Sequence, residues 1–316
     1  MSKVGKAFGM LLGKKPDVPT PSSVVYEKLE VKSGAGRMLF VVGTVLVVVS
    51  IIAATLFIKP ISMRTLEDFG ALFSNSTRLA YVIGFLASLV PPALVMFWIF
   101  RSDRYEPEPR YALAVAIGVG AALSAVASPL VILGKWGLIG LLAAPFIYES
   151  FKVAGLVVLL TSKLQKELND HVDGFVYGAA VGTGFAVVNS SVAFIISYLS
   201  PAPALMLLGT PVAGLVLIQA LNSVLHILSG GFAGFWLGYE RVLDGVVDGR
   251  DLIPALTIAL VIGYLGTIPE VLGVAGIALK TVIVGYFLYT TERILMAALK
   301  DEVAWGYAEG KAPVES

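Results

Sequence analysis

The sequence contains no cysteine among its 316 residues, which excludes disulfide bonds and thiolate metal sites. Charge is also scarce: lysine, arginine, aspartate and glutamate make up 14% of the chain, whereas 57% is hydrophobic. A soluble domain of this size needs a larger charged fraction to cover its surface. The net charge of +1 gives no reason to expect a nucleic-acid partner. These shortages argue against a soluble protein and favour one that resides in a lipid bilayer.

Motifs of soluble catalysis are missing as well. The sequence has no P-loop, no Gly-x-Ser-x-Gly and no His-Glu-x-x-His. Gly182 and Gly184 are not followed by a third glycine at dinucleotide-binding spacing, and they lie in an apolar stretch, so helix packing explains them. The first long apolar run begins near Met38 behind a polar tail, so we expect no cleavable signal peptide.

Long apolar stretches dominate what is present, and a helix needs about 20 such residues to cross the hydrocarbon. We therefore predict an all-α fold, a polytopic transmembrane helix bundle with about eight spans. The predicted spans are 38–58, 79–100, 111–134, 137–161, 174–199, 205–238, 252–268 and 272–291. The sixth is too long for one straight helix, so it is either strongly tilted or begins as a re-entrant piece broken near Pro211.

Lysine and arginine predict the orientation, because they concentrate in cytoplasmic loops. With the N-terminus inside, few basic residues fall outside: Lys59, Arg64, Arg78 and Lys135. Both termini are then cytoplasmic, with a basic N-terminal tail (1–37), a transmembrane domain (38–291) and a C-terminal tail (292–316). Within the first tail, residues 3–15 place apolar side chains near one helical face, which fits either a short interfacial helix on an anionic leaflet or a disordered basic tail. The apolar residues of that face are Val4, Phe8, Leu11 and Leu12.

Three spans carry polar side chains at a similar predicted depth, where a charge costs several kcal/mol. The candidates are Glu149, Asn189 and His226, with Tyr148, Lys152 and Asn222 beside them. Two of these spans also carry small residues at four-residue spacing, which allows close helix contact. The stripes are Gly174, Gly178, Gly182 and Ala186 in one span, and Gly230, Gly234 and Gly238 in the other. We expect the two helices to pack together and to bring the polar groups into one site.

Each of these residues also has a purely structural interpretation. Glu149 and Lys152 lie three apart and could simply neutralise each other. Asn189 could form a helix–helix hydrogen bond, and His226 could be a polar packing residue. Lys280, nearer the predicted outer surface, is expected to snorkel and is given no function.

Four segments, in order, carry a resemblance to a known family. They are Asp103-Arg104-Tyr105-Glu106-Pro107-Glu108-Pro109-Arg110, Ala144-Pro145-Phe146-Ile147-Tyr148-Glu149-Ser150-Phe151-Lys152, residues 173–189 beginning Asp173-Gly174-Phe175, and His226-Ile227-Leu228-Ser229. Over roughly 101–238 the chain resembles the PrsW family of intramembrane proteases, which belongs to the superfamily of the type II CAAX prenyl endopeptidases. The resemblance implies an integral protein of a prokaryotic plasma membrane.

The resemblance also implies a chemistry for the polar residues. Glu149 would be the general base, with His226 and Asn189 holding a water or the oxyanion of the tetrahedral intermediate. Glu149 and His226 are alternatively the ligands of a metal, for which zinc is the candidate cofactor. Two positions depart from the family pattern, because Tyr148 and Asn189 stand where the family has glutamates.

The sequence therefore leaves alternatives for the function. One is an intramembrane endopeptidase that cleaves a membrane-protein substrate. Another is a non-catalytic pseudoprotease whose pocket binds a membrane helix, a lipid or a partner protein. A transporter has less support, since the two halves show no inverted repeats or paired broken spans.

Overall fold

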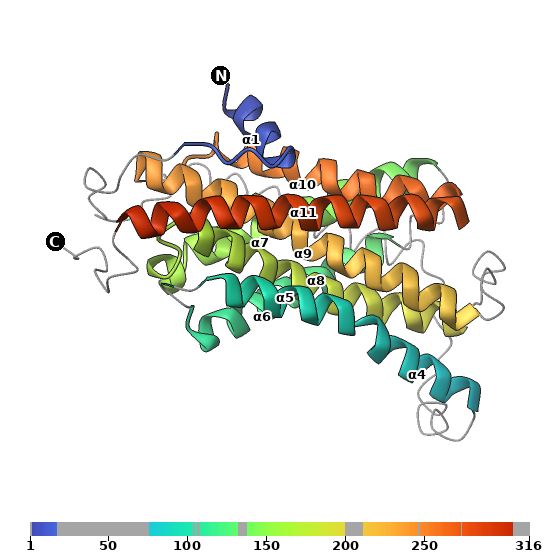
Figure 1. Cartoon of the computed structure of the whole chain (residues 1–316). Coiled ribbons are helices and arrows are strands. Elements are labelled where there is room, and N and C mark those ends of the chain that lie inside the picture. Colours follow the sequence, from blue (N-terminus) through green and yellow to red (C-terminus); the bar gives the residue numbers. More distant parts are fainter. Residues whose placement is uncertain are drawn as a thin grey trace.

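The structure is a computed structural model that describes residues 2–17, 76–103, 105, 108–131, 138–199, 211–245, 247–272 and 274–305. Among these residues the regular structure is helical and includes no strand, which confirms the predicted all-α class. The long helices run alongside one another as one bundle (Figure 1). The helices are α1 (Lys3–Leu11), α4 (Ser76–Ser88), α5 (Val90–Ser102), α6 (Arg110–Val131), α7 (Leu138–Leu160), η3 (Lys163–Lys166), α8 (His171–Leu199), α9 (Pro211–Asp244), α10 (Leu252–Thr267), η5 (Ile268–Leu272) and α11 (Val274–Trp305).

Six of the predicted spans coincide with helices that are long and apolar enough to cross a membrane. The predicted span 252–268 is the exception, because α10 has 16 residues and is continued by the short η5 turn. At 1.5 Å per residue, α10 is about 24 Å long, less than the roughly 30 Å of hydrocarbon. The predicted first span, 38–58, lies outside the described residues.

Prolines decide where two of the helices begin. The span Leu79–Ser102 is divided into α4 and α5 at Leu89, where Pro91 and Pro92 occupy the first turn of α5 and cannot donate to the preceding turn. Likewise α9 begins at Pro211, and it continues without interruption for 34 residues. Its length of about 51 Å exceeds the hydrocarbon thickness, so α9 is tilted or projects beyond the membrane.

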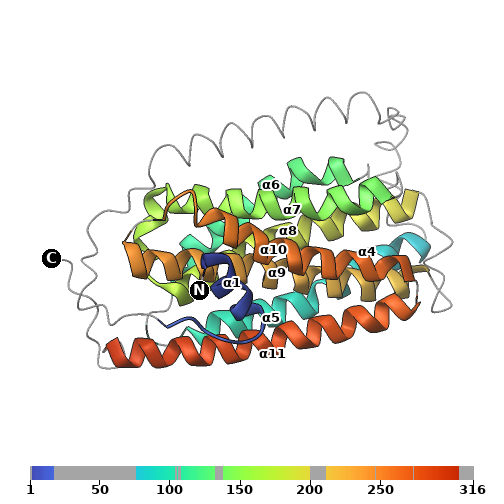
Figure 2. The same ribbon diagram turned by 90° about the horizontal axis from the view of Figure 1, so that it is seen from above.

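The centre of the bundle is the α8–α9 pair, whose glycine stripes face each other as predicted. A Cβ atom at Gly178 would lie 2.1 Å from the carbonyl oxygen of Gly230, and one at Gly234 would lie 1.9 Å from that of Gly174. Only glycine allows backbones to approach this closely. Seen from above, α9 and α10 lie between α6 and α7 on one side and α11 on the other (Figure 2).

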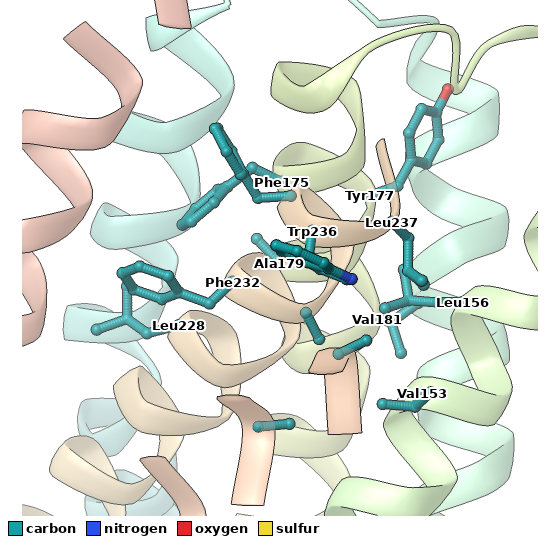
Figure 3. Close-up of a cluster of buried hydrophobic side chains, with 14 of the residues drawn as sticks. Val153, Leu156, Phe175, Tyr177, Ala179, Val181, Leu228, Phe232, Trp236 and Leu237 are labelled. Carbon is teal, nitrogen blue, oxygen red and sulfur yellow. The ribbon is translucent and has the colours of Figure 1, made fainter. Parts of the chain in front are cut away.

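Large apolar side chains fill the bundle on either side of the glycine contact. Phe175 of α8 packs edge-on against Phe232 of α9, with ring centroids 5.6 Å apart, and Trp236 lies in the same cluster (Figure 3). All three are fully buried. Burial of one such ring removes well over 100 Å² of apolar surface from solvent or lipid, so this cluster fixes the rotation of α8 and α9 about their axes.

The N-terminal segment lies at the same end of the bundle as the C-terminal end of α11. Lys15 forms an ion pair with Asp301, and the α1 helix packs on α10 and α11 outside the main bundle (Figures 1 and 2). The predicted helix is therefore present, but of the predicted apolar face only Leu11 is buried, whereas Val4, Phe8 and Leu12 are exposed. Ala7, Met10 and Leu11 are the residues buried against the protein.

Candidate functional site

A continuous chain of polar contacts joins α7, α8 and α9 inside the bundle. The Tyr148 hydroxyl donates to Oδ1 of Asn189 at 3.0 Å, and Nδ2 of Asn189 lies 3.2 Å from Nε2 of His226. On the other side of the ring, Nδ1 of His226 lies 3.1 Å from Nζ of Lys152, which donates to Oε1 of Glu149 at 2.7 Å. Five of the six residues singled out in the sequence are thus brought together.

Local structure explains why these side chains meet. Tyr148, Glu149 and Lys152 occupy one turn of α7, so Glu149 and Lys152 lie on the same face. The glycine contacts continue along α8 and α9 as far as Gly182, where a Cβ would lie 2.2 Å from the carbonyl oxygen of His226. The close backbone approach therefore ends at the level of the histidine, where the polar side chains begin.

The members of this chain differ in exposure, and the two in its middle are the most accessible. Glu149 and Lys152 are buried to 2% and 0% exposure, whereas Asn189 and His226 are half-buried. Glu149 packs against α10, where a Cβ at Gly263 would lie 2.8 Å from its Oε1 atom. A substrate or water can therefore reach Asn189 and His226 more readily than the carboxylate of Glu149.

Ser229 is a member of the site that sequence reasoning did not single out. Its hydroxyl accepts a hydrogen bond from Lys152 and donates one to the carbonyl oxygen of His226. Ser229 lies three residues after His226, on the same face of α9, and that spacing was the available signal. Gly263 was also missed, because its role depends on the packing of α10 and not on a pattern in the sequence.

Asn222 lies near the site but is not part of the polar chain. Its Oδ1 atom accepts a hydrogen bond from Lys280 of α11. Lys280 is 1% exposed, so the expectation that it snorkels to the outer surface is wrong. The physical reason is that Asn222 of α9, one turn from His226, accepts a hydrogen bond from the Lys280 ammonium inside the bundle.

A second cluster of buried acids lies at the end of the bundle where α8 begins. Ligand atoms of Asp103, Glu108 and Asp173 lie within 4.8 Å of one another. Burial raises the pKa of Glu108 to about 8, with Asp103 and Asp170 adding to the shift and hydrogen bonds to Asp173 and Tyr177 opposing it. Asp173 and Asn189 are 16 residues apart on α8, about 24 Å along the axis, so this cluster is separate from the polar chain.

A zinc ion on Glu149 and His226 fits this arrangement poorly. Zinc usually takes three or four cysteine, histidine or carboxylate ligands, and the polar chain offers one histidine and one carboxylate. The Lys152 ammonium lies between them, within 3.1 Å of the ring and 2.7 Å of the carboxylate, where it would repel a cation. The oxygen donors of the acidic cluster suit magnesium, calcium or manganese better than zinc.

Comparisons with known proteins agree with this architecture. A curated protein named Protease PrsW from Clostridioides difficile (strain 630) is 32% identical over 117 residues, which cover 34% of this chain and 49% of that protein. The match thus spans about half the length of that relative. No solved structure matches the chain.

A family model described as "PrsW family intramembrane metalloprotease" matches residues 106–267. This region runs from the start of α6 to the end of α10 and contains every residue of the polar chain. The match covers just over half of the 316 residues. This integral membrane protein therefore belongs to the PrsW family.

Proposed function

We propose that this protein is an intramembrane endopeptidase that hydrolyses a peptide bond in or near a membrane segment of another protein. One observation carries the proposal: His226 is held between Asn189 and Lys152, and Lys152 connects the ring to Glu149. Family membership supports a membrane protease. The family description also implies a metal, but the residues of the polar chain suit zinc poorly, and the proposed hydrolysis uses only protein side chains and water.

The polar chain has two self-consistent proton arrangements. If Glu149 and Lys152 form an ion pair, the ammonium donates to Nδ1 of His226, and the ring carries its proton on Nε2. If the proton moves from Lys152 to Glu149, the neutral amine accepts from Nδ1, and Nε2 becomes an acceptor. In the second arrangement, Nε2 faces the Asn189 amide group, as in the structure, and Tyr148 donates to the amide oxygen.

Peptide hydrolysis would use the acceptor state of His226. A water that takes the place of the Asn189 amide beside the half-buried ring would give its proton to Nε2 while its oxygen adds to the substrate carbonyl carbon. Tyr148 and the Asn189 amide are donors for the oxyanion that forms. When the carbon–nitrogen bond breaks, the proton on His226 passes to the leaving amine, which restores the starting state. Glu149 acts through Lys152 as the acceptor that makes this state available.

A non-catalytic role is the second candidate, and the burial of Glu149 favours it. The carboxylate is 2% exposed and paired with Lys152. The resemblance to the family also implies glutamates at the positions that Tyr148 and Asn189 occupy here. In that case the site would bind a membrane helix or lipid without cutting it.

The test maps new protein N-termini in membranes of cells that produce the wild type, His226→Gln or Glu149→Gln. Ser190→Ala is the matched control: Ser190 is buried beside Asn189, but its partner is Ser223, at 3.0 Å. We expect termini that occur with the wild type and Ser190→Ala and are lost with the other two variants. Identical termini in all four samples would exclude the endopeptidase. A Tyr148→Glu/Asn189→Glu variant that alone produces termini would establish the non-catalytic candidate.

A further inference from the structure

The N-terminal segment, residues 2–17, lies outside the family match yet is anchored to the bundle by several polar contacts. Lys3 forms ion pairs with Glu240 of α9 and Asp251 at the start of α10, both at 2.6 Å. Although burial opposes the charge, hydrogen bonds to Asp251 and Glu240 raise the pKa of Lys3 above its ordinary value. Lys3 therefore stays charged at physiological pH and holds α1 on these two helices.

Docking of α1 leaves a second apolar face uncovered. Ala7, Met10 and Leu11 are buried against the bundle. On the outer side of the helix, Val4, Phe8 and Leu12 are 37%, 43% and 62% exposed. Four-residue spacing aligns these three side chains in one stripe along the helix. The helix is therefore apolar on two faces, of which the bundle covers only one.

The level of α1 along the bundle is marked by residues typical of a membrane boundary. The Tyr286 hydroxyl of α11 donates to the carbonyl oxygen of Leu11 at 2.8 Å. One turn further along, Tyr289 is 57% exposed, and the guanidinium of Arg293 lies 5.9 Å from the centre of its ring. The predicted span 272–291 ends between these two residues, although α11 itself continues to Trp305. Exposed tyrosine and arginine at the end of a span are typical of the lipid headgroup region. The stripe on α1 therefore lies near the level at which a bilayer surface would meet α11.

Charge identifies the kind of surface that the stripe would meet. Residues 2–16 include four lysines and no acidic residue. Lys3 and Lys15 are neutralised by ion pairs with acids of the bundle, which leaves Lys6 and Lys14 as the cations beside the stripe. Lys14 is exposed, and the turn at Gly13, with a φ angle of 73°, brings the chain against the Arg293 side chain. A stripe of apolar side chains flanked by cations is the pattern of a helix that lies in an anionic lipid surface.

We propose that α1 inserts Val4, Phe8 and Leu12 into the headgroup–acyl boundary of an anionic leaflet while its other face remains docked on α10 and α11. The insertion would stabilise the docked position of α1. Because Lys3 contacts both α9 and α10, and these helices carry His226 and Gly263, lipid composition would act on the helices that build the polar chain.

The absence of cysteine makes a direct test possible, because a single introduced cysteine takes a spin label at a known place. The full-length variants Phe8→Cys and Leu12→Cys are labelled and placed in vesicles of phosphatidylcholine, with or without phosphatidylglycerol. Asp17→Cys, an exposed polar position in the same segment, is the matched control. The measured quantity is the ratio of collision rates with oxygen, which dissolves in lipid, and with a nickel chelate, which stays in water.

With phosphatidylglycerol present, we expect a severalfold higher oxygen-to-nickel ratio at positions 8 and 12 than at position 17. The ratio at 8 and 12 should fall in phosphatidylcholine alone. Equal ratios in the two kinds of vesicle would overturn the assignment to an anionic leaflet. Ratios equal to that of position 17 in both would show that the stripe faces water. None of these readings depends on proteolysis, so they stand apart from the proposed function.

Discussion

At the scale of single residues, the Glu149–Lys152 pair is the feature with the largest expected energetic consequence. Both side chains are essentially unexposed, and removing one partner of a buried ion pair typically costs about 3–5 kcal/mol because the other charge is left uncompensated. We therefore expect Lys152→Met to lower the free energy of unfolding by about that amount, and Glu149→Gln/Lys152→Met to recover much of the loss.

Chemical denaturation in detergent micelles would measure these differences. The exposed Lys300→Met provides the control, with an expected change of about 0.5 kcal/mol or less. If the double variant were as unstable as the sum of the single variants, the two residues would not be energetically coupled in the folded protein.

Glu108 leads to a prediction about pH. Its pKa rises from 4.5 in the unfolded chain to about 8 in the folded protein, chiefly through burial. Between these values the folded state binds more protons than the unfolded state, so stability falls as pH rises from about 4.5 to about 8. We expect the midpoint of thermal unfolding to decrease between pH 6 and pH 8, roughly the upper part of that window, and Glu108→Gln to weaken this dependence. A wild-type midpoint that rose over the same range would contradict the assignment.

The sequence was sufficient to predict which polar residues meet inside the bundle but not all of their partners. Glu149, Asn189 and His226 could be found because their depth in a span is a property of the sequence alone. The partner of Lys280 could not, since an ammonium near a span end fits both snorkelling and burial. Whether Lys280 snorkels or is buried depends on whether Asn222 of α9 faces its ammonium group.

At the scale of helices, replacing glycine by alanine should have opposite effects on stability in the α8–α9 contact and on the open face of α6. Gly178→Ala places a Cβ 2.1 Å from the Gly230 carbonyl oxygen, so the helices must separate. Gly118 has no neighbouring atom within 4 Å of an added Cβ, so Gly118→Ala should stabilise α6 by about 1 kcal/mol through helix propensity. Thermal unfolding in micelles should show a lower midpoint for the first variant and an unchanged or higher one for the second.

Hydropathy predicted the existence of the long helices more reliably than the contacts that they make. The spans of α6, α7 and α8 follow from length and composition, because no water satisfies backbone groups in hydrocarbon and each span must be helical. The face of α1 that docks could not be predicted in the same way. With apolar residues on two sides, its pattern fits contact with protein or lipid. Glu240 and Asp251, the acids that anchor α1 through Lys3, lie more than 200 residues away in the sequence.

At the scale of the whole molecule, the order of the helices predicts which side of the membrane each connection faces. The loop between α9 and α10 lies at the same end as the N-terminal segment, since Asp251 contacts Lys3. The basic residues of the sequence predict that this end is cytoplasmic. The turn between α10 and α11 is then external only if α10, with its 16 residues, crosses the bilayer.

Single cysteines at exposed positions of the two connections decide this point. We expect Leu272→Cys to react with a membrane-impermeant maleimide in intact cells and Arg250→Cys to react only after the membrane is opened. The reverse pattern would invert the whole topology and place the N-terminal segment outside. Protection of both positions in intact cells would mean that α10, about 24 Å long, enters from the cytoplasm without crossing. In that case Gly263, which packs on Glu149, would belong to a re-entrant element, and water could approach the polar chain beside it from the cytoplasmic side.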